Sequence, residues 1–528
     1  ITEFLRSVLA DESIADDIIH RYEERARGGR FSTFPDDMHP SLINILNDMG
    51  ISRIFSHQSE AWSAIRGGEH LIITTGTASG KTLCYILPIL QGFIDHPDQT
   101  VLLIFPTRAL AQDQLREIYK FQGIALNFEG VNNNIVQPIH AHVYDSDTPV
   151  SQRQMIKRKV NYLLTNPDML HLGILPHHTS WYKYFQNLRF IIIDEAHSYR
   201  GIFGSHVANV MRRLRRICGF YGSHPQFIMT SATISNPQEH AERLAERSFR
   251  VIDNDGSPFS GRMNMVVNPK IIHDNLGLRR GAGHEATLLS KHLIRNGMQS
   301  IIFTRSRKGV ELLLRDITFD RPDDHIKGYR SGYLPQERRA IEKALKDGSV
   351  KLVISTNALE LGMDIGSVDA IVIAGFPGSL AALRQQSGRA GRRQKPAVAF
   401  FIASQNPIDQ YLVRHPDYLF GRPVEKALIN PDNLSIQLSH IRCALFELPF
   451  SKDEFFGSLG PDLLQEYFLI LEEAREARVS MDKSIWVGNC YPAQAVSLRT
   501  TGGTPIILFQ TDKRGLRSRI GEVDRASA

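Results

Sequence analysis

The sequence predicts an α/β protein with two tandem domains, each a parallel sheet with helices on both faces, and a small C-terminal domain. The chain has 528 residues, which is too many for one hydrophobic core. Short apolar runs recur in two series, and helical patterns lie between them. This strand–helix alternation is typical of parallel sheets that are buried on both faces.

The predicted strands lie on either side of a stretch rich in Gly, Pro, Ser and Asn at 251–270, where we expect the domains to meet. The first series comprises 70–75, 101–105, 190–194 and 227–232, and the second comprises 300–304, 351–356, 370–374 and 397–402. In the second half, "PQERRAIEKALKDG" predicts a helix that begins near Pro335 and ends at Gly348.

The two ends of the chain have a different pattern. Residues 1–50 are polar and predicted to be a helical extension. Beyond about residue 425, a helical segment at 461–479 and short strands at 484–489 and 495–499 predict a small helix-plus-hairpin domain. The expected domains are therefore 1–50, 51–250, 251–425 and 426–528.

The composition excludes several classes of protein. The net charge of +6 fits a solvated basic surface and a nucleic-acid partner equally well. No apolar run approaches the roughly 18 residues of a membrane span, so no membrane partner is expected. The four cysteines are far apart, which predicts no zinc site, no disulfides and a reducing, cytoplasmic setting. Because the first residue is Ile, we expect a processed start or a fragment.

The stretch "TTGTASGKT" at 74–82 follows a predicted strand and precedes a helical run, as a phosphate-binding loop does. Backbone N–H groups at the start of the helix would hold phosphate oxygens, Lys81 would reach the β- and γ-phosphates, and Thr82 would ligate Mg²⁺. Thr75 stands where such loops usually have glycine. The alternative is a capped turn with a solvated lysine.

A second element is the apolar strand that ends in Asp194 and Glu195. Asp194 at a strand end can hold Mg²⁺, and Glu195 can orient and deprotonate an attacking water. A solvated turn is the alternative, but the combination with Lys81 and Thr82 favours a phosphoryl-transfer site.

The third element, "QQSGRAGRR", lies in the other half of the chain. The guanidinium groups of Arg389 and Arg392 can neutralise charge on a γ-phosphate. A site assembled from both domains would close on ATP and open after hydrolysis, as in a motor.

With these elements in order, residues 50–425 resemble superfamily 2 helicases with a DEAH box. "TASGKT", "PTRALA", "DEAH" and "SAT" match the first-half motifs, and "FTRSR", "STNALELGMDIG" and "QQSGRAGR" match those of the second. The resemblance implies two RecA-like domains with ATP bound between them and a nucleic-acid strand across both. It explains Thr75, because the family commonly replaces that glycine.

The resemblance also implies roles for individual residues. Gln58 matches the motif that reads adenine, and Gln385 joins the arginines of the last motif. The implied nucleotide-binding set is Gln58, Thr75, Gly76, Thr77, Ala78, Ser79, Gly80, Lys81, Thr82 and Asp364. Residues implied to couple ATP state to strand grip are Ser231, Thr233 and Gly362.

Polar residues after the predicted strands are candidates for gripping a nucleic-acid backbone, because hydroxyls and amides suit phosphate oxygens without reading bases. Each is equally suited to a cap or turn. We call this set the strand track: Thr107, Arg108, Asp147, Thr148, Thr165, Asn166, Thr304, Arg305, Arg330, Ser331, Thr356 and Asn357.

A narrower resemblance links "DEAHSYRGIFGSHVANVMRRLRRIC", "YDSDTP", "TNPDML" and "INPDNLSIQLSHIRCA" to the mitomycin repair factor A helicases and the fungal RecQ-like repair helicases. It implies 3′–5′ movement on DNA and a winged-helix-like accessory domain. Family members normally continue into a zinc-binding domain, and because no cysteine cluster is found here we expect either a truncated chain or a short homologue. Residues 205–217 are expected to form a helix with an apolar stripe in the core. The four arginines on its opposite side are expected to face solvent or to contact DNA. Trp486, Tyr491 and Arg499 are expected in a core or at a duplex junction.

Three functions remain open on the sequence. The first is an ATP-dependent 3′–5′ DNA helicase in repair, a monomer acting on single-stranded DNA or a 3′-tailed duplex with repair proteins as partners. It would be nucleoid-associated in the cytoplasm, or nuclear in a eukaryote. The second is an RNA helicase or remodeller, since phosphate contacts do not detect the 2′-hydroxyl. The third is a nucleic-acid-binding scaffold with a degenerate ATPase, which Lys81, Glu195, Arg389 and Arg392 argue against.

Overall fold

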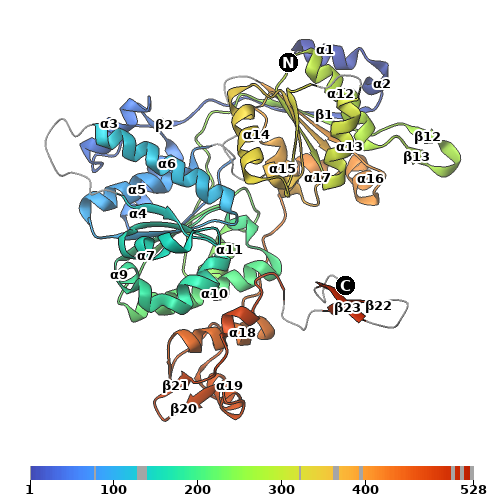
Figure 1. Cartoon of the computed structure of the whole chain (residues 1–528). Helices are drawn as coiled ribbons and strands as arrows, with labels where there is room; N and C mark the ends of the chain where they lie inside the picture. Colours follow the sequence, from blue (N-terminus) through green and yellow to red (C-terminus); the bar gives the residue numbers. More distant parts are fainter. Residues whose placement is uncertain are drawn as a thin grey trace.

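The computed structural model describes residues 2–76, 79–127, 139–319, 323–360, 368–391, 396–500, 506–511 and 517–523. Two seven-stranded sheets form the two halves of the molecule (Figure 1). The strands of the first sheet are all parallel and lie in the order β10 (Arg250–Ile252), β4 (Leu71–Ile73), β9 (Gln226–Thr230), β8 (Leu188–Ile193), β5 (Thr100–Ile104), β7 (Tyr162–Thr165) and β6 (Ala141–Val143). This confirms the parallel sheet predicted for the first half.

Both faces of the first sheet are buried, and this explains why its strands are continuously apolar. Leu71 and Ile73 pack into one core cluster, whereas Ile72 between them packs into another. Alternate side chains of a strand point to opposite faces, so each face needs its own apolar set. The helices that accompany this sheet are α4 (Ser56–Arg66), α5 (Lys81–Asp95), α6 (Arg108–Asn127), α7 (Val150–Lys159), α8 (Pro167–Met169), α9 (Tyr182–Gln186), α10 (Gly201–Phe220) and α11 (Pro237–Ala245).

The second sheet repeats this architecture. Its order is β1 (Ile18–Glu24), β11 (Arg262–Val267), β18 (Ala397–Ile402), β17 (Ala370–Ala374), β14 (Ser300–Thr304), β16 (Leu352–Ser355) and β15 (Ile326–Tyr329), and only β1 is antiparallel. The helices of this half are α12 (Ala282–Arg295), α13 (Arg307–Thr318), α14 (Pro335–Asp347), α15 (Leu380–Ser387), α16 (Pro407–Arg414) and α17 (Asp417–Phe420). The predicted helix α14 is confirmed, and Gly348 ends it with a φ of 81°.

The first fifty residues differ from the expected helical extension. They begin with α1 (Thr2–Leu9) and α2 (Glu12–Ala15), but β1 then completes the second sheet along β11. The chain crosses to the first half, where β2 (Phe31–Ser32) pairs with β3 (Ile54–Phe55), and α3 (Pro40–Asp48) follows β2. Figure 1 shows α1 beside α12 in one half and α3 in the other. The polar pattern of β1 misled the sequence prediction, because an edge strand needs little apolar surface.

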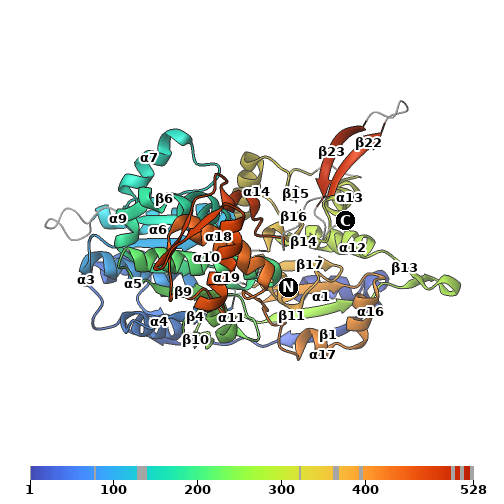
Figure 2. The same ribbon diagram turned by 90° about the horizontal axis from the view of Figure 1, so that it is seen from below.

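The C-terminal domain packs against the first half (Figure 2). It contains α18 (Leu434–Glu447), α19 (Pro461–Glu473) and a sheet of β19 (Phe450–Ser451), β21 (Lys483–Trp486) and β20 (Ala477–Val479). The prediction of a strand at 495–499 is wrong, because a 3₁₀ turn at Pro492–Ala495 leads into irregular chain. A hairpin, β22 (Ile506–Thr511) and β23 (Arg517–Val523), follows.

A further hairpin in the second half pairs β12 (Ile271–His273) with β13 (Leu278–Arg279). Within the described part of the chain, no helix is long and apolar enough to cross a membrane.

Candidate functional site

The predicted phosphate loop connects β4 to the start of α5. Gly80 immediately before the helix has a φ of 79°, a conformation that favours glycine. The Lys81 ammonium lies inside the loop, where it donates hydrogen bonds to the carbonyl oxygens of Thr75 and Gly76, each at 2.8 Å. Burial lowers the pKa of Lys81, and the nearby carboxylates of Glu195 and Asp194 oppose that shift. The lysine is therefore enclosed beside acidic groups, not solvated as in the alternative prediction.

Thr75, which replaces the usual glycine, has a defined place in the loop. Its side chain is buried, and its hydroxyl lies 2.6 Å from the Ser79 hydroxyl. Each hydroxyl thus provides a partner for the other across the loop. The substitution adds an internal hydrogen bond, which is consistent with a functional loop.

Gln58 braces the same loop from α4. Its amide nitrogen donates to the Gly80 carbonyl at 3.0 Å, and its amide oxygen accepts from the Phe55 N–H at 2.9 Å. A side chain at position 80 would approach the Gln58 amide to 2.7 Å, which gives the glycine a second reason to be there. The role of Gln58 in reading adenine stays a prediction.

Asp194 and Glu195 follow β8 and lie next to the loop. Asp194 Oδ1 accepts hydrogen bonds from the Thr230 hydroxyl and, at 3.0 Å, from the Glu195 N–H. Burial, followed by the charge of Glu195, raises the pKa of Asp194 to about 6. Burial also raises the pKa of Glu195, while Lys81 and then Arg389 lower it. Two carboxylates are thus held together with little solvent.

This donor set fits Mg²⁺. Carboxylate and hydroxyl oxygens are its preferred ligands, and a cation would relieve the repulsion that raises the Asp194 pKa. Thr82 and Asp194 are the residues that would hold it, as predicted from the sequence. Bound Mg²⁺ would neutralise phosphate charge. In the described ranges, no group of three or more His, Cys, Asp or Glu is arranged to hold a metal.

The backbone at Glu195 is unusual. Its φ of 50° is positive, which is rare for a residue other than glycine and is common at functional sites. Glu195 Oε2 lies 3.4 Å from His197 Nδ1, and the same nitrogen accepts the Ala232 N–H at 3.1 Å. His197 therefore joins the acidic strand end to the segment after β9. Sequence reasoning did not assign this role, although the histidine belongs to the quoted motif.

Arg389 brings the second half of the chain into the site. The side chain is 1% exposed, and it donates to the Glu360 carbonyl oxygen at 2.6 Å. Its charge acts on the pKa of Glu195, and the amide of Gln385 acts on that of His197. The structure thus places residues of both halves at one centre.

The remaining predicted residues of this centre have varied settings. Ser231 is fully buried and donates to the Ala232 carbonyl oxygen at 2.7 Å, whereas Thr233 is exposed. Five predicted residues lie outside the described residues: Thr77, Ala78, Gly362, Asp364 and Arg392.

The strand track follows from the topology of both sheets. In the first half the track residues end or follow β5, β6 and β7, and in the second they end or follow β14, β15 and β16. Each trio forms adjacent strands in its sheet. The carboxyl ends of parallel strands share one edge, so the track residues of each half gather there. The ATP candidates Lys81, Asp194 and Ser231 follow β4, β8 and β9, the other side of the first sheet.

Track residues differ in whether they can reach a ligand. The exposed members are Thr107, Arg108, Asp147, Arg305, Ser331 and Asn357, and the partly exposed members are Asn166, Thr304 and Arg330. Arg108 pairs with Asp147 at 2.6 Å, and Arg330 pairs with Glu311 at 2.6 Å. Arg108 and Arg330 are therefore partly accessible cations at the carboxyl edges of the two sheets.

Three track residues are buried instead. The hydroxyl of Thr165 donates to the Tyr144 carbonyl oxygen at 2.8 Å, that of Thr148 accepts from the Asp145 N–H at 2.9 Å, and Thr356 caps a 3₁₀ turn. Their side chains stabilise turns at strand ends, which was the alternative for each residue.

The arginines of α10 do not form the solvated face that the sequence predicted. Arg212 pairs with Asp432, Arg213 with Glu447 and Arg216 with Glu454, all in the C-terminal domain. Arg215 pairs with Glu246. Periodicity located the core stripe, but it cannot reveal acidic partners more than two hundred residues away.

Trp486, Tyr491 and Arg499 also serve packing in this structure. The Trp486 and Tyr491 rings contact Phe446, and the Tyr491 hydroxyl donates to the Leu172 carbonyl oxygen at 2.5 Å. Arg499 makes two hydrogen bonds to Asp168, at 2.6 and 2.9 Å. Of the two predicted settings, core packing and domain docking account for these residues.

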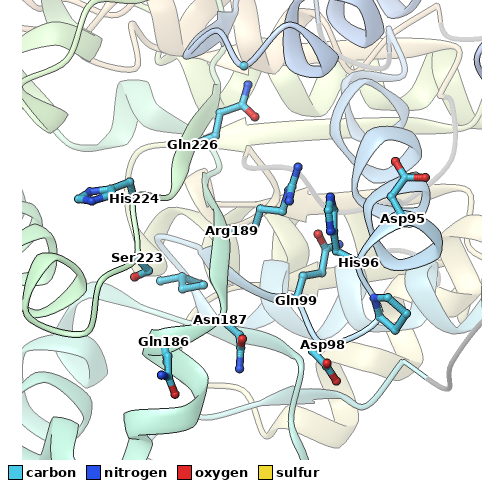
Figure 3. A pocket seen from close by; sticks show the side chains of 13 residues that line it. Asp95, His96, Asp98, Gln99, Gln186, Asn187, Arg189, Ser223, His224 and Gln226 are labelled. Carbon is cyan, nitrogen blue, oxygen red and sulfur yellow. The ribbon is translucent and has the colours of Figure 1, made fainter.

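A polar pocket of about 660 Å³ lies on the first half (Figure 3). Gln99, Asn187 and Gln226 line it at the amino ends of β5, β8 and β9. The candidate ATP site lies at the opposite, carboxyl ends of these strands. The pocket is therefore separate from the chemistry described above.

Comparisons with known proteins agree with this architecture. Residues 55–240 match the DEAD/DEAH box helicase family, 285–394 match the helicase conserved C-terminal domain, and 429–501 match the winged helix domain of the ATP-dependent helicase HRQ1. The chain is 42% identical to the uncharacterised ATP-dependent helicase YprA of Bacillus subtilis, over 99% of this chain and 69% of YprA. It is 36% identical to the ATP-dependent helicase hrq1 of Schizosaccharomyces pombe, over 90% of this chain and 45% of that protein.

The structure is similar to that of the DUF1998 helicase MrfA bound to DNA, with a TM-score of 0.87 and 41% identity over 100% of this chain and 69% of MrfA. These matches confirm two RecA-like domains followed by a winged-helix domain. The chain belongs to the DEAD/DEAH-box ATP-dependent helicases of superfamily 2, with the MrfA/YprA and Hrq1 proteins as close relatives.

Proposed function

We propose that the protein is an ATP-dependent DNA helicase that moves 3′ to 5′ along single-stranded DNA, enters duplexes from a 3′ tail, and acts in DNA repair. The observation that carries this proposal is that Arg389 of the second half lies near enough to lower the pKa of Glu195 in the first half, so residues of both halves can act on one phosphoryl group. Such a centre changes when ATP is hydrolysed, and that change can move one half relative to the other.

The residues divide the chemistry among themselves. Lys81 offers a cation inside the phosphate loop. Glu195, whose pKa burial raises, is a stronger base than an exposed carboxylate and can accept a proton from an attacking water. Arg389 would stabilise negative charge as the phosphoryl group transfers, and its burial fixes it there.

The strand track supports a single strand as the moving substrate. Track residues of both halves gather at the carboxyl edges of their sheets, where a strand can be held by its phosphates. Alternating grip by two such edges gives stepwise movement. DNA as the strand is supported by MrfA, whose crystal structure with bound DNA matches this chain over its full length.

Relatives and composition support the setting that we propose. The resemblance of the sequence motifs to repair helicases supports a repair role. Work on chromosomal DNA would place the protein at the nucleoid, or in the nucleus of a eukaryote. We propose a monomer as the active form, since one chain supplies both halves of the ATP site. Mass measurement on DNA of stated length tests this, and a dimer on a minimal 3′-tailed duplex would contradict it.

Unwinding assays test the function directly. DNA duplexes with a 3′ tail, DNA duplexes with a 5′ tail and RNA duplexes are compared at one salt concentration, with Glu195→Gln as the inactive control. We expect ATP-dependent unwinding of the 3′-tailed DNA alone. Equal activity on 5′ tails would contradict the polarity, and preference for RNA would favour an RNA helicase. ATP hydrolysis that DNA does not stimulate would favour a binding scaffold.

A further inference from the structure

Two crossings of the chain between its two halves lie side by side. Residues 25–30 form the first, and residues 253–261 form the second; we call them the paired connectors. Arg27 and Phe259 exchange two backbone hydrogen bonds of 2.8 and 3.0 Å, and the Arg30 N–H donates to the Gly256 carbonyl oxygen at 2.8 Å. The chain returns to the first half through residues 421–426, so relative movement of the halves involves this pair together with that third link.

The paired connectors are attached to the ATP site through Asp255. Its Oδ2 accepts a hydrogen bond from the Arg27 guanidinium at 2.7 Å and another from the Gly76 N–H of the phosphate loop at 3.2 Å. Its Oδ1 accepts from the Ser257 N–H at 2.9 Å and the Ser257 hydroxyl at 2.6 Å. The carboxylate thus links both connectors to a backbone donor of the loop.

Asp255 remains ionised at neutral pH. Burial alone would raise its pKa, but the hydrogen bonds from Ser257, the charge of Arg27 and the Gly76 N–H lower it below the usual range. The side chain is only 10% exposed. Its charge also acts on Lys81, together with Glu195 and Asp194. A fixed negative charge therefore lies at the loop whose purpose is to bind phosphate.

We propose that Asp255 is a positioning residue that occupies the loop as a resident carboxylate and is displaced when nucleotide phosphates bind. The proposal rests on the proposed function in that the loop must bind ATP. Backbone N–H groups of such loops bind phosphate oxygens, and negative charges repel one another where solvent is scarce. Nucleotide phosphates therefore compete with Asp255 for the loop. When the carboxylate is displaced, the Gly76 N–H loses its Asp255 acceptor. Asp255, still paired with Arg27, can then move together with the connectors.

The displacement provides a direct link from nucleotide binding to the connectors. In the free protein the carboxylate ties residues 253–261 to the loop through Gly76. Once nucleotide is bound, that tie to the loop is absent, and the bonds between the two connectors remain. Whether nucleotide occupies the loop then determines how freely the two halves can move relative to each other.

Nucleotide affinity tests the proposal in the full chain. Asp255→Asn keeps the shape of the side chain and removes its charge, so it should lower the Kd for a fluorescent ATP or ADP analogue by about tenfold, as expected when a competing state populated at roughly 90% is removed. Asp253→Asn is the matched control, because Asp253 is exposed on the same connector and loses the same charge. It should leave the Kd unchanged.

A second variant tests the link to the connectors. Arg27→Gln leaves Asp255 without its cation, so the Kd should rise. In a protein that already carries Asp255→Asn, Arg27→Gln should leave the Kd unchanged, because position 255 no longer has a negative charge for Arg27 to neutralise. An Asp255→Asn protein that binds nucleotide with equal or weaker affinity overturns the inference, as does an equal effect of Asp253→Asn.

These results are distinguishable from a failure of the proposed function. A protein that hydrolyses ATP without unwinding DNA contradicts the helicase proposal, yet tighter nucleotide binding by Asp255→Asn would still support this inference. Additive effects of the Arg27 and Asp255 changes on the Kd would show that the two residues act separately and would overturn it.

Discussion

The Arg213 guanidinium lies against the Glu447 carboxylate, and the two side chains are 0% and 1% exposed. Arg213 comes from α10 of the first half, and Glu447 ends α18 of the winged-helix domain. A charge pair this deeply buried persists only because each charge compensates the other. The pair therefore fixes the winged-helix domain to the first half.

Breaking this pair should destabilise the docked domain. Arg213→Ala leaves the Glu447 carboxylate buried without its cation, which costs about 3–5 kcal/mol. Urea denaturation with proteolysis of the C-terminal domain measures this loss. Arg315→Ala removes an exposed arginine and should change stability by less than about 0.5 kcal/mol. An apolar double variant, Arg213→Met with Glu447→Leu, should be more stable than Arg213→Ala, and the opposite order would contradict the pair's role.

Three histidines extend the same contact in a fixed direction. Arg213 can only donate, so Nδ1 of His171 at 2.7 Å and of His440 at 3.3 Å must accept. His440 Nε2–H then donates to His206 Nδ1 at 3.0 Å, and His206 Nε2–H donates to the Thr500 carbonyl oxygen at 2.6 Å. Each ring must be neutral for this order of donors. Burial, and then Arg213, lowers the pKa of His171 to about 3.

Docking should therefore weaken in acid. The docked pKa values of His171, His206 and His440 lie below the value of about 6.5 for a free histidine. The undocked state binds more protons, so the contribution is complete above about pH 6.5 and falls as pH decreases, by about 1.4 kcal/mol per pH unit for each histidine. Denaturation from pH 7.5 to 5.5 measures the slope.

A matched pair of variants tests that slope. His206→Gln should reduce the dependence on pH, because one titrating ring is removed from the contact. His224→Gln changes an exposed histidine and should leave the slope unchanged. Equal slopes in the two variants would contradict the neutral-histidine account.

Gly457 provides a separate test of docking. Its φ is 60°, and a side chain there would overlap the Arg212 guanidinium, which pairs with Asp432. Gly297 has a similar φ of 63° but open space around it. Gly457→Ala should therefore cost about 1–3 kcal/mol more than Gly297→Ala, because only the first adds a steric clash to the backbone strain. Equal losses on urea denaturation would show that Arg212 is not confined.

Lys81→Ala should abolish ATP hydrolysis. The ammonium lies inside the loop, bonded to the Thr75 and Gly76 carbonyl oxygens, and the variant would lose the cation that we propose contacts the β- and γ-phosphates. Hydrolysis with saturating single-stranded DNA measures this effect, and Lys346→Ala, on α14 of the other half, is the control. Retained DNA-stimulated turnover in Lys81→Ala would refute the assignment of the loop.

The sequence predicted most of the fold because buried parallel strands carry a strong local signal. Runs such as 351–356 are apolar throughout, so their strands were evident. β1 was missed because an edge strand of Tyr22 and charged neighbours has no such signal. The winged-helix region was predicted as helix plus hairpin, but residues 495–499 form no strand: a 3₁₀ turn ends at Ala495, and the Val496 carbonyl oxygen lies 3.2 Å from His171 Nε2 instead of pairing with a strand.

The site was predictable where motifs are local and unpredictable where contacts are distant. Lys81, Asp194 and Glu195 lie in short motifs whose chemistry is readable from residue type. Asp255 lies far along the chain from Gly76, and only the fold brings them to 3.2 Å. Thr165 fits the track by position, yet its hydroxyl points inward, which a strand-end pattern cannot reveal.

We propose that the two halves share one ATP site through Arg389. The most direct test measures hydrolysis and nucleotide binding separately in Arg389→Ala, with Arg384→Ala on the same segment as control. We predict that Arg389→Ala lowers the rate of DNA-stimulated hydrolysis by about 10³-fold or more, as for an arginine that stabilises transferring phosphate, while the Kd for a non-hydrolysable ATP analogue changes much less. Hydrolysis at the unaltered rate in Arg389→Ala would contradict the claim.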